Sequence, residues 1–554
     1  MVSARRVKFE YKYGCHDLSS ITTPRPDRGR SPRARAWLST INHGNRGISV
    51  IYPTSYFEGL IEQSAKNPKK AWKEVNRLLG CKNKCGIDSL RVKERVLTDQ
   101  QDIADEFGRF FSSVVGVFGE GNGCVDSNGQ LLACESEFVF DRIEEEDVLK
   151  LLCSLDPNKA IGVDRICAKL LRTAGPGISH SLTSLFNASL KCGKLPNEWK
   201  SARITPVPKG GDNEIVGNFR PVSVLPVVVK VFERLVHQQL YTYLQENSLL
   251  HSTQFGFRPG HSTQDALVSL VDEWREALDK DMLVGSVFLD FSKAFDMVDH
   301  SILLEKLSWY GVRGGELKWF EGYLKGRRQR VCVGGATSEW TDIRRGVPQG
   351  SILGPLLFIL YANDLTQAVH QSKVKQYADD TTMSLVSSDA IWLEKGLVDD
   401  LEGVARWVEA NKLQLNVKKT KLMLLSRKRR AHELKNVEVR IDDQKIERSK
   451  SVKCLGVLLD DGLTWKEQVQ SVRKGSFAGL ARLRRLKDVL SPNTKKKIYN
   501  TMVLPHLDYC SVVWQVVVVY SRQLSLSSYC VLLLSFVFEV LYHWDPNTKG
   551  RIPP

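Results

Sequence analysis

The sequence has no apolar run of about 18 or more residues, the length that a membrane-spanning helix needs. Its most apolar stretch, Tyr529–Tyr542, is shorter and contains Glu539. No basic start followed by an apolar core and a small-residue cleavage site opens the chain, so a secretory signal peptide is not expected. These absences favour an intracellular protein in a reducing compartment, nucleus or cytoplasm, with no membrane partner.

Cysteine is present, but not in the pattern of a disulfide framework or a zinc centre. The 12 cysteines are scattered along the chain. Cys81 and Cys85 are the only close pair, and no histidine or second pair follows them at the spacing of zinc ligands. We therefore interpret them as structural thiols.

Basic charge is abundant. Lysine and arginine number 79 against 63 acidic residues, which gives a net charge of +16. This excess predicts a polyanionic partner, and nucleic acid fits better than a membrane surface. Hydrophobic residues make up 42% of the 554 residues, which is typical of a folded chain. At roughly 150 residues per domain, three or four domains or subdomains are expected.

Composition divides the chain into five segments: 1–48, 49–188, 189–460, 461–515 and 516–554. The first lacks an apolar period and is predicted to be a disordered basic tail; its acids Glu10, Asp17 and Asp27 argue against a mitochondrial transit peptide. The second is predicted to be a helical linker region, with Asp99 as the cap of one helix. The fourth is basic and helical, and the fifth is an atypical apolar tail.

The third segment alternates strand-like runs with helices. Helical spacing of apolar residues predicts amphipathic helices over 232–244, 267–278, 300–311 and 397–408. An apolar helix is expected after Gly350, and the apolar run 283–289 predicts a buried strand. Because the alternation has no strict βαβ rhythm, we expect an α+β fold with a sheet backed by helices on one face.

Acidic residues follow two of the strand-like runs. Asp290 comes directly after the run 283–289, and Asp379 and Asp380 lie in a YADD stretch with strand-like residues on both sides. Alone, each is more often a helix cap or a solvated turn. Together, three carboxylates at two strand ends are what a pair of Mg²⁺ ions needs to activate a 3′ hydroxyl and stabilise a leaving pyrophosphate. With the basic charge, this favours a polymerase.

Seven sequence blocks in a fixed order carry a resemblance to a known family. They are residues 204–225, 254–267, 287–300, 346–365, 376–383, 413–426 and 452–465. Through them the chain resembles the reverse transcriptases of non-LTR (LINE-type) retrotransposons, closest to the jockey-like group. The resemblance implies a right-hand fold of fingers, palm and thumb, with a helical N-terminal extension. It also implies DNA synthesis from an RNA template, a DNA primer and deoxynucleoside triphosphates.

The resemblance also implies the metal ligands. Asp290, Asp379 and Asp380 match the family's metal-binding aspartates, and all three are intact. They would bind two Mg²⁺ ions, with Mn²⁺ as an alternative. The backbone carbonyl of Phe291 would also contact a metal.

Two blocks imply a nucleotide pocket. Phe295 matches a ring beneath the incoming sugar that leaves no room for a 2′ hydroxyl; without the block it would be read as a core residue. Gln349 matches the residue that contacts the incoming nucleotide, and Gly350 follows it. The alternative for these two is a purely structural turn.

Three basic residues match phosphate-handling positions. Lys209 and Arg220 correspond to residues that hold triphosphate oxygens, a task for which Arg offers two donors and Lys a point charge. Lys419 matches a lysine that protonates the leaving pyrophosphate. Without the resemblance, each would be read as a solvated surface side chain.

Two basic runs, 324–331 (LKGRRQRV) and 426–430 (SRKRR), remain. Either is suited to neutralising template–primer phosphates. The second fits a nuclear localisation signal or a solvated turn equally well.

The chain also departs from the family. Residues before about 190 lack the length and pattern of the apurinic-type endonuclease that intact elements carry, and 516–554 resembles read-through into unrelated sequence. We therefore expect a truncated copy without that endonuclease. The alternative function is an inactive or domesticated protein that only binds nucleic acid, against which the intact aspartates argue. An RNA-templated RNA polymerase is disfavoured by Phe295.

Overall fold

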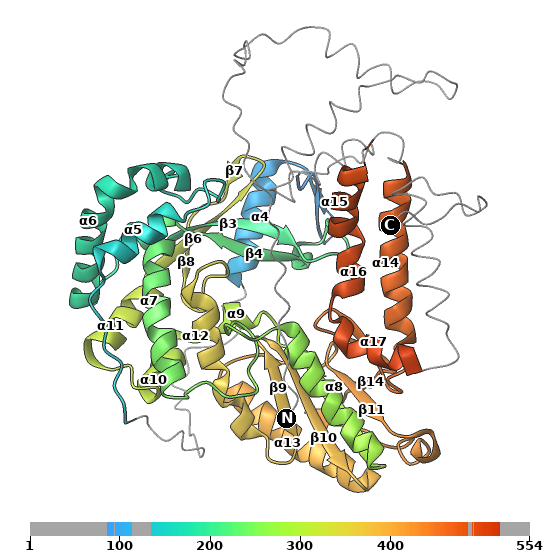
Figure 1. The fold of residues 1–554 in the computed structure, drawn as a ribbon. Coiled ribbons are helices and arrows are strands. Elements are labelled where there is room, and N and C mark those ends of the chain that lie inside the picture. Colours follow the sequence, from blue (N-terminus) through green and yellow to red (C-terminus); the bar gives the residue numbers. More distant parts are fainter. Residues whose placement is uncertain are drawn as a thin grey trace, which may run out of the picture. The chain divides into compact units, whose positions relative to one another are not determined.

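The computed structural model describes residues 86–93, 95–113, 135–441, 443–485, 490 and 492–520, the last five without side-chain detail (Figure 1). Helices and strands are mixed along this part of the chain, so the predicted α+β class is confirmed. The predicted basic tail and the pair Cys81 and Cys85 lie outside the described residues. So does the predicted apolar tail, apart from the backbone of residues 516–520.

The central sheet has five strands. In spatial order they are β14 (Glu447–Arg448), β11 (Lys421–Leu425), β5 (Leu283–Leu289), β10 (Asp380–Ser387) and β9 (Lys373–Tyr377). The β5 strand is antiparallel to both of its neighbours, and only β14 runs parallel to its partner. The predicted buried strand is thus confirmed, in the middle of the sheet.

Helices cover both faces of this sheet. Val287 packs on the side of α13 (Ala390–Ala410), whereas Val284 packs on the side of α8 (Thr263–Asp279). The prediction of helices on one face was therefore wrong. The physical signal was in the sequence, because a strand buried on both faces is apolar throughout rather than alternating.

A second sheet lies beside the first. Its strands are β4 (Phe219–Val224), β3 (Ser201–Pro208), β6 (Arg327–Val333), β7 (Ala336–Thr337) and β8 (Thr341–Ile343), the last paired with β6. The helix α4 (Gln100–Ser113) covers one face, where Phe107 meets Phe219 with ring centroids 5.0 Å apart. Asp99 caps α4 as predicted, since its carboxylate accepts from the backbone N–H groups of Gln101 and Asp102.

The region predicted to be helical before residue 188 also contains a hairpin. Its strands are β1 (Leu90–Val92) and β2 (Arg95–Leu97). Before Lys93, which has φ 54°, Leu90, Arg91 and Val92 alternate between apolar and charged, but the residues of β2 (RVL) do not alternate. Three alternating residues are a short signal, and the helical prediction overlooked it.

Most remaining helices pack into one core together with the central sheet. They are α5 (Glu145–Cys153), α6 (Ala168–Cys192), α7 (Val227–Glu246), α9 (Ala294–Met297), α10 (His300–Trp309), α11 (Gly314–Leu324) and α12 (Leu353–Tyr361). Phe186 of α6 stacks on Phe232 of α7 at 4.6 Å between centroids. The helices predicted from apolar spacing are confirmed as α7, α8, α10, α12 and α13.

The C-terminal part of the described chain is mainly helical. It comprises β12 (Arg440–Ile441), β13 (Gln444–Lys445), β15 (Ser451–Cys454), β16 (Val457–Asp460), α14 (Lys466–Arg485), α15 (Pro492–Met502), α16 (Leu504–Asp508) and α17 (Ser511–Tyr520). The helices α14, α15 and α16, orange to red in Figure 1, pack side by side.

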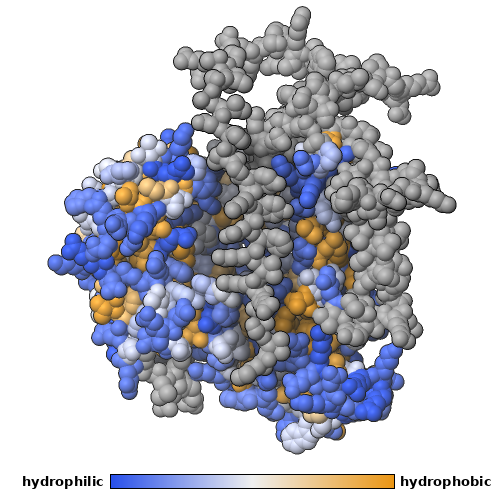
Figure 2. Space-filling model, in the orientation of Figure 1, coloured by the Kyte–Doolittle hydropathy of each residue, from blue (hydrophilic) through white to orange (hydrophobic). Residues whose placement is uncertain are grey.

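Hydrophilic residues cover most of the described surface on the face drawn in Figure 2, with small hydrophobic areas between them. Within the described residues, no helix combines the length and apolar character that crossing a membrane requires. The six cysteines described there are all free thiols.

Candidate active site

Two strand ends bring the predicted aspartates to one place. The β5 strand ends at Leu289, which pairs with Thr381 of β10. One step further, Asp290 leaves β5 opposite Asp380, the first residue of β10, and Asp379 occupies the turn before it. The antiparallel register therefore gathers three carboxylates that are up to 90 residues apart in sequence.

The turn that carries Asp379 is braced from outside. Ala378 adopts φ 58°, and a Cβ on Gly256 would lie 2.3 Å from its backbone nitrogen, so only glycine allows this approach. The buried Gln254 side chain accepts hydrogen bonds from the backbone N–H groups of Gly256 at 2.9 Å and Ala378 at 3.1 Å. Sequence reasoning did not assign Gln254 a role, although it begins the block 254–267.

The three carboxylates have little compensating charge. Partial burial raises the pKa of Asp379, and the charge of Asp290 adds to the shift. Burial, followed by the charges of Asp379 and Asp290, raises the pKa of Asp380 to about 6, against the opposing effect of Arg220. Among the described residues, only the Lys419 ammonium lies within ion-pair range, 4.0 Å from Asp290.

A short loop fixes Asp290 from the other side. Asn416 donates its backbone N–H to the Asp290 carbonyl at 2.7 Å, and the buried Thr420 hydroxyl accepts from the Asp290 N–H at 3.3 Å. This loop is the segment that carries Lys419. The backbone of Phe291 forms a bridge with Leu415 next to it. The structure therefore places Lys419 and Phe291 beside the aspartates.

Gln349 and Gly350 lie in a tight turn against β4. The Gln349 carbonyl accepts from the Ser223 N–H at 2.6 Å. Gly350 has φ 118°, and a Cβ there would lie 2.6 Å from the Ser223 carbonyl oxygen, so a larger residue would push the turn off the strand.

Asp296 holds the Gln349 side chain and was not recognised from the sequence. The Gln349 amide nitrogen donates to the Asp296 carboxylate at 2.8 Å. Burial raises the pKa of Asp296 to about 6, against the opposing effect of the hydrogen bond from Gln349. With its nitrogen on Asp296, the Gln349 amide has its oxygen on the other side.

Phe295 is stacked on one side and partly open on the other. Its ring lies 4.3 Å from that of the buried Phe358, nearly parallel, and 6.1 Å from the exposed ring of Phe257 at right angles. It is therefore neither a fully buried core residue nor a free surface ring. This geometry is compatible with both interpretations of Phe295 given by the sequence.

Lys209 and Arg220 lie at the end of the β3–β4 hairpin. Val207 pairs with Arg220 and Pro208 with Phe219, and Lys209 follows Pro208 at the end of the hairpin. Burial, followed by the charges of Lys419 and Arg220, lowers the pKa of Lys209. The same set of charges includes Asp290, so the structure brings these cations and the aspartates into one electrostatic environment.

The residues described suit a divalent cation but do not form a ready-made cage. No group of three or more His, Cys, Asp or Glu side chains in the described part of the chain has the arrangement of a metal centre as it stands. Asp379 and Asp380 nevertheless have raised pKa values, and Lys419, 4.0 Å from Asp290, is the one cation within ion-pair range among the described residues. An added positive charge would therefore stabilise these carboxylates. That donor set fits Mg²⁺.

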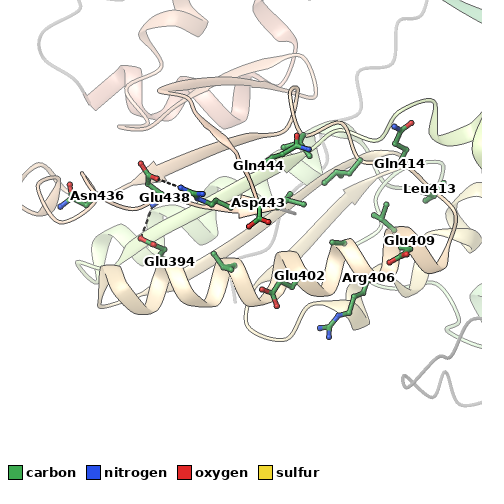
Figure 3. A pocket seen from close by; sticks show the side chains of 17 residues that line it. Glu394, Glu402, Arg406, Glu409, Leu413, Gln414, Asn436, Glu438, Asp443 and Gln444 are labelled. Carbon is green, nitrogen blue, oxygen red and sulfur yellow. Dashed lines mark hydrogen bonds and ion pairs between the residues drawn. The ribbon is translucent and has the colours of Figure 1, made fainter. Parts of the chain in front are cut away.

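A cavity elsewhere contains none of the predicted site residues. It has a volume of about 1210 Å³ and lies between α13 and residues 436–444 (Figure 3). Its charged lining includes Glu394, Glu402, Glu409 and Glu438. An acidic cavity of this kind is unsuited to a triphosphate or to nucleic acid, so its size does not make it the catalytic site.

Comparison with known proteins agrees with the geometry. Residues 207–459 match the family model described as "Reverse transcriptase (RNA-dependent DNA polymerase)". The chain is 30% identical over 396 residues to a Drosophila melanogaster protein named "Probable RNA-directed DNA polymerase from transposon X-element". It is 29% identical over 375 residues to the "RNA-directed DNA polymerase from mobile element jockey" of the same species.

These matches cover most of this chain but less than half of each relative. The X-element match spans 69% of this chain and 42% of the relative, and the jockey match spans 66% and 40%. The functions of the unmatched parts of those relatives therefore cannot be transferred to this chain.

Proposed function

Because the chain belongs to the reverse transcriptase family of non-LTR retrotransposons, in its jockey-like group, we propose that it extends a DNA 3′ end on an RNA template. The observation that carries the proposal is the meeting of Asp290, Asp379 and Asp380 at paired strand ends with almost no compensating charge. The substrates are an RNA template, a DNA primer and deoxynucleoside triphosphates.

The two sheets and the C-terminal helices take the parts of a right hand in this proposal. The central sheet is the palm, because the aspartates lie at the ends of its strands β5 and β10. The sheet of β3, β4 and β6 is the fingers, because Lys209 and Arg220 lie at its tip. The helices α14, α15 and α16 are the thumb, in the basic segment 461–515, and the region 49–188 is a linker before the polymerase.

Asp290, Asp379 and Asp380, with the carbonyl of Phe291, would hold two Mg²⁺ ions, or Mn²⁺ in their place. When bound, such ions lower the pKa of the primer 3′ hydroxyl and neutralise charge on the transferring phosphate. The protein's own contribution is to hold the three carboxylates in place. It does so through the β5–β10 register, the Gln254 brace, and the hydrogen bonds that the Asp290 backbone accepts from Asn416 and donates to Thr420.

The basic side chains handle the triphosphate. Arg220 and Lys209 bind its oxygens and so orient it in line with the primer. Lys419 is the proton donor for the leaving pyrophosphate, because its ammonium lies beside Asp290 at the reacting end. Two of these cations are on the fingers and one is on the palm, so nucleotide binding draws the two parts together.

Two residues set which sugar is accepted. The partly open ring of Phe295 lies beneath the sugar and excludes a 2′ hydroxyl by its bulk. Gln349 presents its amide oxygen to the nucleotide, held in that orientation by Asp296. The bulk of Phe295 therefore favours a deoxyribose, while Gln349 contacts the nucleotide.

A primer-extension assay tests the proposal. The purified chain is given Mg²⁺, deoxythymidine triphosphate and oligo(dT) annealed either to poly(rA) or to poly(dA). We expect extension on the RNA template. Binding to poly(rA)–oligo(dT) without any extension would instead support the alternative of a polymerase-derived nucleic-acid-binding protein.

A further inference from the structure

The two basic runs of the sequence differ in what surrounds them. In the run 426–430, Arg427 pairs with Asp279 at 3.2 Å, and Arg429 pairs with Asp281 at 2.6 Å. In the run 324–331, Arg328 and Arg330 form no ion pair with any carboxylate in the part of the chain that the structure describes. The first run therefore has its charge largely neutralised by the protein. In the second, Lys325 pairs with Glu321 at 2.6 Å, but Arg328 and Arg330 have no carboxylate partner among the described residues.

The unpaired arginines are organised around a tryptophan. The guanidinium carbons of Arg328 and Arg330 each lie 4.7 Å from the ring centroid of Trp340. Such cation–π contacts orient a guanidinium without neutralising it. Arg328 also donates from Nε to the Ser201 hydroxyl at 2.9 Å, which leaves its terminal nitrogens available.

A third arginine shares the same face of the sheet. Arg203 of β3 pairs in register with Arg330 of β6, so both side chains point to one side. The Nε atoms of Arg203 and Arg330 are buried and have no hydrogen-bond partner. Asp342 lies opposite Arg328 in the β6–β8 register, but no ion pair joins the two among the described residues.

This face is the reverse of the one that meets the active site. Gln329 lies between Arg328 and Arg330 on β6 and points the opposite way, where it lines a small cavity together with Asp296 and Gln349. The arginines therefore cannot serve the incoming nucleotide from their own side of the sheet. They are instead available to a separate anionic ligand.

We propose that Arg203, Arg328, Arg330 and Trp340 form a second RNA-binding site, which holds the phosphodiester backbone of template RNA that is not in the catalytic cleft. Arg328 and Arg330 are two residues apart on one strand, so their Cα atoms are about 6.6 Å apart and each guanidinium takes its own phosphate. Planar guanidinium groups bind phosphate oxygens through two parallel donors. Trp340 fixes these groups beforehand and so lowers the entropy cost of binding.

The ligand class follows from the proposed function, but the site is tested by binding rather than catalysis. Fluorescence anisotropy of a labelled single-stranded RNA is measured over a series of KCl concentrations, with a DNA of the same sequence in parallel. R328A/R330A should weaken RNA binding roughly tenfold, and it should reduce the slope of log K against log salt by about 1.4, since each phosphate contact on a single strand contributes about 0.7.

Two further variants separate this site from general charge. R427A/R429A removes the same number of positive charges from the neutralised run, and it should leave both affinity and slope nearly unchanged. W340L keeps every charge, so it should lower affinity with the slope unchanged. R328Q/R330Q serves as a second form of the double variant if R328A/R330A unfolds early.

Equal losses of RNA affinity in R328A/R330A and R427A/R429A would overturn the proposal, because they would indicate non-specific electrostatic attraction by the whole protein. Unchanged RNA binding in R328A/R330A would overturn it as well. Tighter binding of the DNA than of the RNA, lost in the same variant, would reassign the site to DNA. Extension on a short template–primer should be unaffected in R328A/R330A, so the outcome is independent of whether the proposed catalytic activity is found.

Discussion

Asp364 and Asp380 belong to the same domain but are surrounded in opposite ways. Asp364 is buried, and its carboxylate accepts from the Lys306 ammonium at 2.7 Å and from the Trp407 indole at 3.1 Å. Asp380 has two neighbouring carboxylates instead, and its pKa is raised to about 6 by burial and by their charges. The protein therefore neutralises one acid internally and leaves the other without a partner.

This difference separates an acid that stabilises the fold, Asp364, from acids that we propose to be catalytic. Asp364 links α10, which carries Lys306, to α13, which carries Trp407, so its hydrogen bonds join elements far apart in sequence. Among the described residues, Asp379 and Asp380 form no ion pair, and Asp290 has only Lys419, at 4.0 Å. Repulsion among them costs stability, and a bound cation would relieve it.

The largest effect is expected when one of the unpartnered acids is removed. Asp379→Asn should lower the rate of primer extension by about a thousandfold or more, equivalent to about 4 kcal/mol, because a carboxylate ligand at the reacting centre is lost. Single-turnover extension on poly(rA)–oligo(dT) measures this. The melting temperature should not fall, since one of three like charges has been removed; near-normal extension would refute the assignment.

The partnered acid should show the reverse pattern. Asp364→Asn leaves Lys306 buried without a counter-charge, so the free energy of unfolding should fall by about 3–5 kcal/mol. Denaturant titration measures this, and extension per folded molecule should stay unchanged. In the double variant Lys306→Met, Asp364→Leu, part of the stability should return. The exposed pair Lys280 and Glu276 is the control, and breaking it should have no measurable effect.

How much of this contrast could be predicted from the sequence depends on how far apart in the sequence the contacting residues are. The strand β5, the acid after it and the YADD turn were predictable, because each is signalled within a few residues by apolar runs and turn types. The pairing of Lys306 with Asp364 was not, since it joins residues 58 positions apart and either residue alone is read as exposed. Asp296 was hidden for the same reason, as its partner is Gln349.

The same limit explains the error about the sheet. An apolar run of seven residues predicts burial of 283–289 but does not say what buries it. Trp274 of α8 and Leu397 of α13 lie on opposite faces of β5, and neither is a neighbour in sequence. The roles given by the resemblance to Phe295, Lys209, Arg220 and Lys419 stay predictions, because the structure shows their positions and not their ligands.

One pair of stacked rings, Phe295 and Phe358, tests the difference between a residue that packs the core and a residue that contacts substrate. Phe358 is buried and Phe295 is partly open, although their centroids are only 4.3 Å apart. Phe295→Val should lower the preference for deoxynucleotides over ribonucleotides by about tenfold or more, because space opens beneath the sugar. The ratio of the two kcat/KM values measures this. An unchanged ratio in a still active variant would make Phe295 a packing residue only.

The matched Phe358→Ala change should act on stability instead. It removes a buried ring, so it should lower the free energy of unfolding by about 3–5 kcal/mol. The sugar preference of the remaining folded protein should change much less than in Phe295→Val, because Phe295 itself stays in place.

The smallest effect tests whether the unpartnered acids wait for a cation. If Mg²⁺ binds the folded chain at Asp290, Asp379 and Asp380, then Mg²⁺ at ten times its dissociation constant should add about 1.4 kcal/mol of stability and raise the melting temperature by about 1–3 °C. Asp290→Asn should lose most of this increment. Asp364→Asn should melt earlier but keep the increment in full, because Asp364 pairs with Lys306 in the unsubstituted protein and is not one of the proposed Mg²⁺ ligands. An equal Mg²⁺ response in both variants would mean that the ion acts through general screening, and that the two kinds of acid do not differ in the way proposed.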